Sequence, residues 1–414
     1  MQRYYPKLAI LCSLISSHGM AAAMDQSGQS LLPFLEAGHY FEASISAADP
    51  EVSGHTLGTR PDLVNSENDD YSTDNISQNF QYYSAALKLQ LKPELSFGIL
   101  YDQPFGSDLQ YPLKDNGSFS DPALSKQGTQ INVDTQNLSL VLGYQPFKNF
   151  NLYAGPAFQN IKGDVSLRGL VYADLNGYNA VFKEDAAIGW LAGFAYQLPD
   201  IALKAALTYH SKIDHNINIS ENILGTPLLL LDETETKIST PQSVNLDFQT
   251  SVTVSTLLYS NIRWVNWKDF VIRPTQFGAL SERTAAAMSG GTCTGGFELD
   301  DYQKDQWSAS VGVAKKWTQQ WSSAFDLSWD SGTGDPASIF NPTKGYWGIG
   351  LAIQYSPEPD YFISGGAKYF WLGDVTAQDG TYNLPLPGVS EASKVGEFND
   401  NHAIGYGLKI GYHF

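Results

Sequence analysis

The chain has 414 residues, of which 43% are hydrophobic, 13% aromatic and only 16% charged, and its formal net charge is −18. Average soluble domains carry charge on about 25% of their residues, so this chain is poor in charge for that class. Its aromatic content is also too high for a disordered chain. The acidic balance supplies no basic stripe for phosphates, which argues against a nucleic-acid partner. By length, one large β-barrel fits as well as two or three domains.

The first residues have the pattern of a secretory signal peptide. Arg3 and Lys7 supply positive charge, residues 8–15 form a short apolar core, and Ala21-Ala22-Ala23 is a small-residue cleavage site. We therefore predict that residues 1–23 are a signal peptide and that the mature chain begins at Met24.

The segment that follows, residues 24–35, contains the apolar stretch Leu31-Leu32-Pro33-Phe34-Leu35. Its proline disfavours a strand, so the apolar side chains must leave water in another way. Inside a barrel they would plug the lumen, and outside it they would lie against the rim as a periplasmic tail. We predict a plug, with Leu32, Phe34 and Leu35 contacting the transported molecule.

The rest of the chain, residues 36–414, has an apolar residue at every second position in many segments. The last strand is the clearest example, because Ile404, Tyr406, Leu408, Ile410, Tyr412 and Phe414 fall on one face. Such a row suits a strand with lipid on one side and a polar lumen on the other, although a half-buried strand of a soluble sandwich has the same period. Aromatic residues at the ends of other rows favour the membrane barrel.

Counting such segments predicts fourteen strands, an even number as single-chain bacterial barrels require. They lie near residues 36–47, 78–92, 94–104, 129–146, 149–165, 178–198, 201–219, 236–253, 255–272, 304–317, 320–330, 343–357, 360–375 and 401–414. Short turns alternate with long polar connections, so both chain ends should lie on the periplasmic side. We predict an all-β protein, a transmembrane antiparallel barrel whose short N-terminal segment plugs the lumen.

The third predicted strand ends in Tyr101-Asp102-Gln103-Pro104-Phe105-Gly106. Proline cannot donate to a strand ladder and glycine weakens it, so the pair marks a kink or a strand end. A kink at Pro104, Phe105 and Gly106 would open a gap in the wall, whereas a strand end at the rim would have no function. Composition alone slightly favours the strand end.

Two predicted extracellular loops are unusually apolar. One contains Leu224 and the run Leu228-Leu229-Leu230-Leu231, and the other contains Leu167 and Leu170. Each exposed leucine forgoes about 1.5–3 kcal/mol of burial free energy. The loops are therefore either a capture surface for a hydrophobic molecule or a small core of their own.

Catalytic and metal-binding patterns are missing from the sequence, so we predict neither an enzyme nor a cofactor or metal. His210, Asp214 and His215 are close together, but we interpret them as polar surface residues near the rim. Asn68-Asp69-Asp70 suits a divalent ion that bridges lipopolysaccharide, although an exposed acidic loop is the better explanation. Cys293 lies in a glycine-rich loop without an evident partner.

Several of these segments resemble the FadL/TodX family of outer-membrane transporters for long-chain fatty acids and other hydrophobic compounds. The block from Leu95 to Gly106 is similar to the family's kinked third strand. Further resemblances are carried by Gly189-Trp190-Leu191-Ala192-Gly193, by Val265-Asn266-Trp267-Lys268-Asp269-Phe270 and by Tyr346-Trp347-Gly348-Ile349-Gly350. Together they span about residues 78–375 in the expected order.

The resemblance implies passive uptake of a hydrophobic molecule, with long-chain fatty acids first and aromatic or alkane hydrocarbons as the alternative. Loops 166–177 and 220–235 would capture it, a lumen pocket including Trp190 and Trp267 would bind it, and the kink would release it sideways. The family's arginine is replaced by Gly345 here, so the candidates for the counter-charge of a carboxylate are Lys344, which a solvated position at the rim explains better, and Arg168. A structural or adhesive barrel is a rival of a different class.

Under either reading we expect a multi-pass protein of the bacterial outer membrane that acts as a monomer. Its partners would be hydrophobic small molecules, outer-membrane lipid and lipopolysaccharide, with no nucleic acid. One departure from the family is that only about a dozen residues, 24–35, precede the first strand. Gating by this plug would therefore be simplified.

Overall fold

The structure is a computed structural model that describes residues 23–57, 72–113, 118–121, 123 and 125–414. The predicted signal peptide, apart from Ala23, and the acidic stretch 68–70 lie outside the described residues.

Fourteen antiparallel strands form the wall, and three of them are interrupted. In chain order the wall contains β1 (Tyr40–Glu51), β3 (Phe80–Lys92), β4 with β5 (Leu95–Asp102, Gly106–Gln110), β6 (Gln130–Phe147), β7 (Phe150–Ser166), β8 (Tyr178–Leu198), β9 with β10 (Leu203–His210, Ile213–Ile223), β12 with β13 (Glu235–Thr240, Ser243–Thr253), β14 (Thr256–Val265), β17 (Gln306–Lys316), β18 (Trp321–Asp330), β20 (Tyr346–Glu358), β21 (Tyr361–Leu372) and β24 (His402–His413).

The first and last strands close the sheet into a barrel. β1 pairs with β24 along its whole length, with Tyr40 opposite His413 and Glu51 opposite His402. Every wall strand then has two neighbours, so the sheet has no free edge. The predicted fold class, strand number and order are confirmed.

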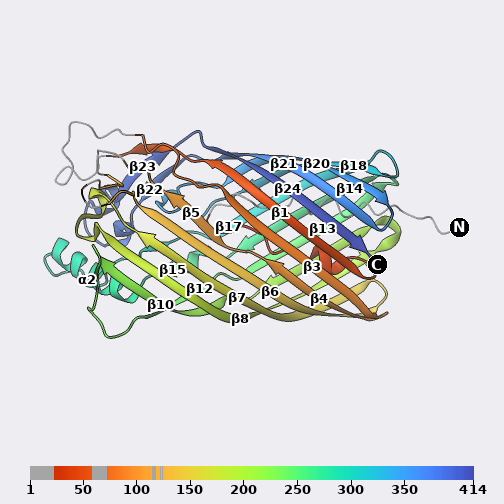
Figure 1. Cartoon of the computed structure of the whole chain (residues 1–414), viewed down its shortest axis with the longest axis horizontal. Coiled ribbons are helices and arrows are strands. Elements are labelled where there is room, and N and C mark those ends of the chain that lie inside the picture. Colours follow the sequence, from red (N-terminus) through yellow and green to blue (C-terminus); the bar gives the residue numbers. More distant parts are fainter. Residues whose placement is uncertain (1–22, 58–71, 114–117, 122, 124) are drawn as a thin grey trace.

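Connections are short at one end of the barrel and long at the other, as predicted. Pro93-Glu94 joins β3 to β4 and Lys148-Asn149 joins β6 to β7, at the end where the C-terminus lies (Figure 1). We call this the turn end and the opposite one the loop end. Helix α2 (Thr275–Met288), β22 (Val375–Gln378) and β23 (Lys394–Phe398) lie at the loop end.

The remaining elements are short. They are η1 (Leu32–Leu35), β2 (Gly54–Thr56), η2 (Leu170–Leu175), η3 (Pro199–Ile201), β11 (Thr226–Pro227), η4 (Trp267–Asp269), β15 (Val271–Ile272), β16 (Asp300–Asp301), β19 (Ala337–Ser338), η5 (Gly380–Asn383) and α3 (Val389–Ala392). None of the helices within the described ranges is both long and apolar enough to cross a membrane.

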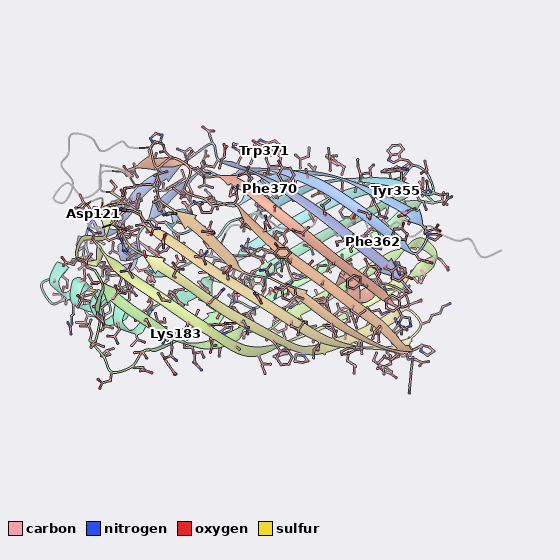
Figure 2. All side chains as sticks on the ribbon, in the orientation of Figure 1. Asp121, Lys183, Tyr355, Phe362, Phe370 and Trp371 are labelled. Carbon is pink, nitrogen blue, oxygen red and sulfur yellow. The ribbon has the colours of Figure 1, made fainter. Side chains whose placement is uncertain are left out.

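The outward face of the wall carries the apolar rows that the sequence predicts. Leu408 on β24 is 60% exposed, whereas its neighbour Lys409 points inward and is buried. Phe370 and Trp371 on β21 likewise point to opposite sides of the wall (Figure 2). Trp329, Trp347 and Trp371 lie side by side on three adjacent strands near the loop end. Such an aromatic row suits the boundary between lipid and water.

The inward face changes from apolar to polar along the strands. On β6 the inward residues nearest the loop end are Ile131 and Val133, and those further along are Asn137 and Ser139. Large apolar side chains under the loops form the main core of the molecule. The interior is therefore apolar near the loop end and polar further along the barrel. The third wall strand, β4 with β5, borders both parts.

Candidate functional site

The described N-terminal residues, 23–36, enter the barrel and are bound to inward-facing side chains of its wall. Nε of Arg263 on β14 lies 2.8 Å from Oδ2 of Asp25, and both side chains are buried. The Arg263 guanidinium also donates to the Gly28 carbonyl, as does Nδ2 of Asn245 at 2.8 Å. A buried ion pair is tolerated when further hydrogen bonds satisfy both ions, and this arrangement provides them.

A second contact fixes the short helix η1 of the same segment. Phe34 is buried against Gly98 of β4 and Gly143 of β6, where an added Cβ atom would lie 2.5 Å and 2.8 Å from the ring. The Phe34 ring also meets Tyr153 of β7 edge-on, with centroids 5.8 Å apart. These two wall positions need glycine, because the Cβ atom of any other residue would collide with the phenylalanine ring.

Two lysines hold the end of the segment near the turn end of the barrel. Lys204 forms an ion pair with Glu36, and Nζ of Lys88 donates to the Glu36 carbonyl at 2.8 Å. Of the predicted plug residues, Phe34 and Leu35 are buried and Leu32 is half-buried. Phe34 and Leu35 pack against inward-facing wall residues such as Leu100 and Val141.

The third wall strand is broken at the predicted kink. β4 ends at Asp102 and β5 begins at Gly106, so Gln103, Pro104 and Phe105 belong to neither piece. The ladder between β3 and β4 ends at the pair Ala85–Tyr101, whereas β5 pairs with β6 alone among the named strands. The strand is thus interrupted within the wall and does not simply end at the rim, which composition alone slightly favoured.

The N-terminal segment supplies hydrogen bonds at this break. The Gly106 amide donates to the Met24 carbonyl at 2.8 Å, and the Gln26 amide donates to the Pro104 carbonyl at 2.7 Å. The Phe105 amide donates to Oγ1 of Thr135 on β6. Because irregular backbone at membrane depth must be satisfied by protein groups, these bonds allow the wall to break here.

An apolar pocket lies beside the kink on its loop-end side. Its lining includes Met24, Phe105, Ile131, Val133 and Trp267. The rings of Phe105 and Trp267 meet edge-on with centroids 5.5 Å apart, and both side chains are buried. Two predicted site residues that are far apart in sequence are therefore brought together at one pocket, as ligand sites require.

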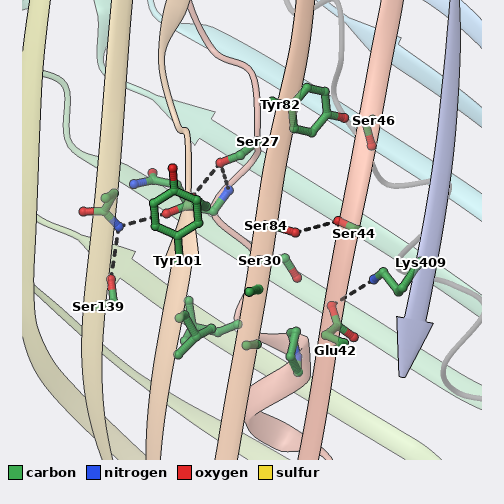
Figure 3. Close-up of a pocket in the computed structure, with 18 of the residues that line it drawn as sticks. Ser27, Ser30, Glu42, Ser44, Ser46, Tyr82, Ser84, Tyr101, Ser139 and Lys409 are labelled. Carbon is green, nitrogen blue, oxygen red and sulfur yellow. Dashed lines mark hydrogen bonds and ion pairs between the residues drawn. The ribbon is translucent and has the colours of Figure 1, made fainter. Parts of the chain in front are cut away.

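A second, polar chamber lies next to the N-terminal segment, and Figure 3 shows its lining. Asn137 and Ser139 line it from β6, directly after the inward positions that line the apolar pocket. Tyr101 and Ala85 also line it, and they are the last pair of the β3–β4 ladder. The polar chamber thus extends to the place where the wall opens.

The two predicted capture loops divide into buried and exposed leucines. Leu167 is buried and Leu228 packs against the main core. Leu229 is 82% exposed, Leu224 57% and Leu170 37%. Some of these leucines therefore contribute to a core, as one interpretation expects, whereas others face outward, and their role in capture stays a prediction.

The leucine run is fixed to helix α2 through one glutamine. Oε1 of Gln276 accepts hydrogen bonds from the Leu230 and Leu231 amides, and its Nε2 donates to the Leu231 and Glu233 carbonyls. The backbone of the loop is therefore ordered, and this order holds the Leu229 side chain outward.

Of the predicted substrate-binding residues, only Phe105 and Trp267 line one of these two cavities; the predicted plug residues, the loop leucines, Trp190 and the two predicted counter-charges do not. Trp190 is 53% exposed on the outward face of β8, where its ring packs beside Tyr209, because Leu191 takes the inward position. Arg168 donates to the carbonyls of its own loop, and Lys344 pairs with Asp335 at 2.9 Å. Neither cation faces a pocket, since loop groups already bind both.

The interpretation of His210 and His215 as rim surface residues is wrong. Both are buried and face inward, while Asp214 faces outward and bonds to Ser239. The period of two slips because residues 211–212 separate β9 from β10. His215 bonds to Asp185 and Gln159, and His210 lines the polar chamber.

Arg263 was not predicted as a functional residue. Its signal in the sequence is a lone arginine among the apolar and small residues of Leu257–Val265. Its role becomes apparent only from its partner in the fold, Asp25, which is 238 residues away in the chain. Within the described residues, no three His, Cys, Asp or Glu side chains gather as a metal site.

Comparison with known proteins places these features in context. The model of the family described as outer membrane protein transport protein (OMPP1/FadL/TodX) matches residues 40–331. A search of curated proteins finds no match.

Solved structures share the fold at low sequence identity. A Pseudomonas aeruginosa FadL homologue superposes with a TM-score of 0.65 at 14% identity, covering 97% of this chain and 98% of that chain. The toluene transporter TodX of P. putida gives 0.61 at 13% identity, covering 97% and 98%. The toluene transporter TbuX of Ralstonia pickettii gives 0.56 at 10% identity, covering 96% and 97%.

Proposed function

Since the chain belongs to the OMPP1/FadL/TodX family of outer membrane transport proteins, we propose that it takes up hydrophobic compounds passively, by loop capture, lumen binding and lateral exit. The observation that carries the proposal is the apolar pocket in which Phe105 of the kink meets Trp267. As a member of this family with a fourteen-stranded barrel, the protein is a multi-pass protein of the bacterial outer membrane.

Capture at the loop end follows from the exposed leucines. The exposed side chains of Leu224 and Leu229 would offer apolar surface to the outside. Leu167 and Leu228, in the two predicted capture loops, pack in or against the main core. A hydrophobic molecule gains about 25 cal/mol for each Å² of apolar surface that it removes from water, so it would pass from these loops to the pocket without an energy source. No catalysis and no cofactor are needed for this step.

Release is proposed to occur sideways through the break between β4 and β5. A hydrophobic molecule that left into water would lose the apolar contacts that drew it in, whereas lipid preserves them. Residues 24–35 would act as the plug. The hydrogen bonds of Met24 and Gln26 to the kink would then have to break or shift before a molecule could pass.

The choice of substrate depends on where a negative charge could bind. The sequence favours long-chain fatty acids, whose carboxylate needs a cationic partner. The four buried lysine and arginine side chains of the described residues are engaged, since Lys368 pairs with Asp326, Lys409 with Glu42 and Arg263 with Asp25, and Lys88 binds a carbonyl. Lys162 also lines the apolar pocket, but its side chain is exposed and lies 3.8 Å from Asp134. The engagement of the buried cations favours the alternative, a neutral aromatic or alkane compound.

A deletion strain complemented with the intact gene tests both candidates. Uptake of oleate and of toluene is measured separately as a function of external concentration. Oleate uptake that depends on the protein would support fatty acids, and toluene uptake alone would support hydrocarbons. Dependence of neither on the protein would refute the proposed transport and favour a structural or adhesive barrel. We propose a monomer in outer-membrane lipid, which sedimentation of the detergent-solubilised protein would test.

A further inference from the structure

Eight of the nineteen residues that line the polar chamber carry a hydroxyl group, and apolar side chains such as Leu31 and Leu100 complete the lining. Six serines contribute to its surface, namely Ser27, Ser30, Ser44, Ser46, Ser84 and Ser139. Its volume of about 90 Å³ is several times the 10–15 Å³ that one water molecule needs. The chamber is therefore large enough for the polar part of a small organic molecule.

Two buried polar atoms of this chamber have no hydrogen-bond partner among the described residues. They are Oδ1 of Asn137 and Nε2 of His210, and both side chains are at least nine-tenths buried. The orientation of the Asn137 amide is set by its Nδ2, which donates to Asp102 at 3.0 Å and to Ser139 at 3.1 Å. Its carbonyl oxygen is thus left as a buried acceptor, which a donor on a bound molecule would satisfy.

The charges around the chamber oppose an anion. Asp102 and Glu42 both line it, and Lys409 is bound by Glu42 at 2.9 Å. The Tyr40 hydroxyl donates to the other oxygen of Glu42 at 2.6 Å, so this carboxylate is fully engaged within the protein. A carboxylate ligand would meet two acidic residues and one neutralised lysine, whereas a neutral ligand would meet no such repulsion.

The chamber also has a defined place along the proposed route. Inward positions 131, 133 and 135 of β6 line the apolar pocket, and positions 137 and 139 line the polar chamber. Between them the Asp25 backbone forms a bridge with Phe105. A molecule in the apolar pocket would therefore reach the chamber when the N-terminal segment moves.

We propose that the polar chamber is a second binding site, for a neutral molecule that joins an apolar body to a hydroxyl group, such as a phenol or an alcohol. Its O–H donates to Oδ1 of Asn137, and its oxygen lies among the serine hydroxyls and His210. This inference rests on the proposed function and narrows its substrate class from hydrocarbons to hydroxylated compounds.

Equilibrium dialysis of the full chain in lipid nanodiscs tests the inference, with empty nanodiscs as the blank. The probes are 4-methylphenol, p-xylene, in which a methyl group replaces the hydroxyl, and the anion 4-methylbenzoate. Asn137→Leu should weaken binding of 4-methylphenol about fivefold, the factor that one ordinary hydrogen bond contributes, and leave p-xylene unchanged or tighter. His210→Phe should act in the same direction, and 4-methylbenzoate should bind weakest.

Asn151→Leu is the matched control, because Asn151 on β7 is equally buried, has an Oδ1 without a partner and does not line the chamber. The second site is refuted if Asn137→Leu and His210→Phe weaken binding of p-xylene as much as binding of 4-methylphenol, or if neither of them changes 4-methylphenol binding. The proposed transport stands in either case. If the wild-type protein binds neither neutral probe, the proposed function itself fails. Retention of the heat-resistant folded band on gels verifies that each variant is folded.

Discussion

Single side chains decide how the N-terminal segment is held. Arg263 brings together Asp25, Gly28, Gln29, Ser243 and Asn245, which lie in two distant parts of the chain. Replacing one member of a buried ion pair leaves the other charge without compensation, and this is more costly than never forming the pair. The interaction therefore makes the position of the segment sensitive to one residue.

Arg263→Met is expected to lower the free energy of unfolding by about 3–5 kcal/mol, because the Asp25 carboxylate would stay buried without its partner. Urea titration in detergent micelles, followed by tryptophan fluorescence, measures this change. Lys162→Met is the control, since Lys162 and Asp134 form an exposed pair at 3.8 Å, and its effect should stay within about 1 kcal/mol. Equal effects of the two substitutions would contradict the assigned role of Arg263.

The protonation of a second residue, Asp300, is expected to affect the stability of the extracellular loops. It accepts a hydrogen bond from Ser338 and so connects the loop after β14 to the loop after β18. Burial, aided by the charge of Asp301, raises the pKa of Asp300 to about 7. Its other carboxylate oxygen has no partner among the described residues, which fits a protonated group.

The folded loops should therefore be more stable in acid than in base. Because the folded pKa is raised, the unfolded state loses its proton first, and stability falls as the pH rises from about 4 to about 7. Digestion of the loops by a broad-specificity protease should be slower at pH 5.5 than at pH 8.5, relative to an unfolded reference substrate. Asp300→Asn keeps the acceptor for Ser338 and should abolish the difference, and a difference that persists would exclude Asp300 as its source.

At the scale of elements, the third wall strand combines an ordinary ladder with a break. Pro104 cannot donate a hydrogen bond, and an added Cβ atom on Gly106 would meet the Gln26 side chain at 2.6 Å. The break is filled by the backbone of the N-terminal segment, which is bonded to it at Pro104 and Gly106. Segment and strand thus form one unit, and a change in either should alter the other.

Straightening this strand by Pro104→Val with Gly106→Val should block transport while binding to the apolar pocket persists, because a continuous ladder would close the wall. Uptake by whole cells and equilibrium binding by the purified protein separate the two effects. Pro156→Val is the matched control, since Pro156 pairs with Trp190 in the regular part of the ladder between β7 and β8. Undiminished uptake by the double variant would rule out lateral exit at this segment.

At the scale of the whole molecule, the barrel has an apolar loop end and a polar middle. The large side chains under the loops form one core, while the middle contains buried ion pairs such as Lys368 with Asp326. A molecule that enters from outside would meet apolar surface first and hydroxyl groups later. The direction of uptake would then follow from the order of the environments.

Leu229→Ser with Leu231→Ser should therefore reduce uptake several-fold at low substrate concentration, with little effect at saturation and no loss of stability, because both side chains are exposed. Uptake kinetics and thermal unfolding measure the two quantities. Leu91→Ser is the control, as Leu91 is comparably exposed but lies at the turn end. An identical uptake curve for the loop variant would leave these leucines without a role in capture.

The sequence by itself determined the barrel, the number of strands and their order, and it marked Pro104 and Gly106 as either a kink or a strand end. These features depend on local patterns, namely the period of two, the turn residues, and a proline and glycine in one strand. It also indicated Phe105 and Trp267, which line the apolar pocket. It predicted Trp190 for the lumen, whereas the side chain lies on the outer face of β8. Local sequence does not tell which face of a strand is inward once bulges and breaks shift the alternation.

Only the tertiary structure decided the rest. Asp25 and Arg263, or Asn137 and His210, are ordinary residues in the sequence, and they acquire roles because closure of the barrel and entry of residues 23–36 bring them together. The same holds for charge, since only the fold places a carboxylate beside a lysine, as it does for Lys368 and Lys409. Pairing between distant residues depends on the closed sheet, which no single segment encodes.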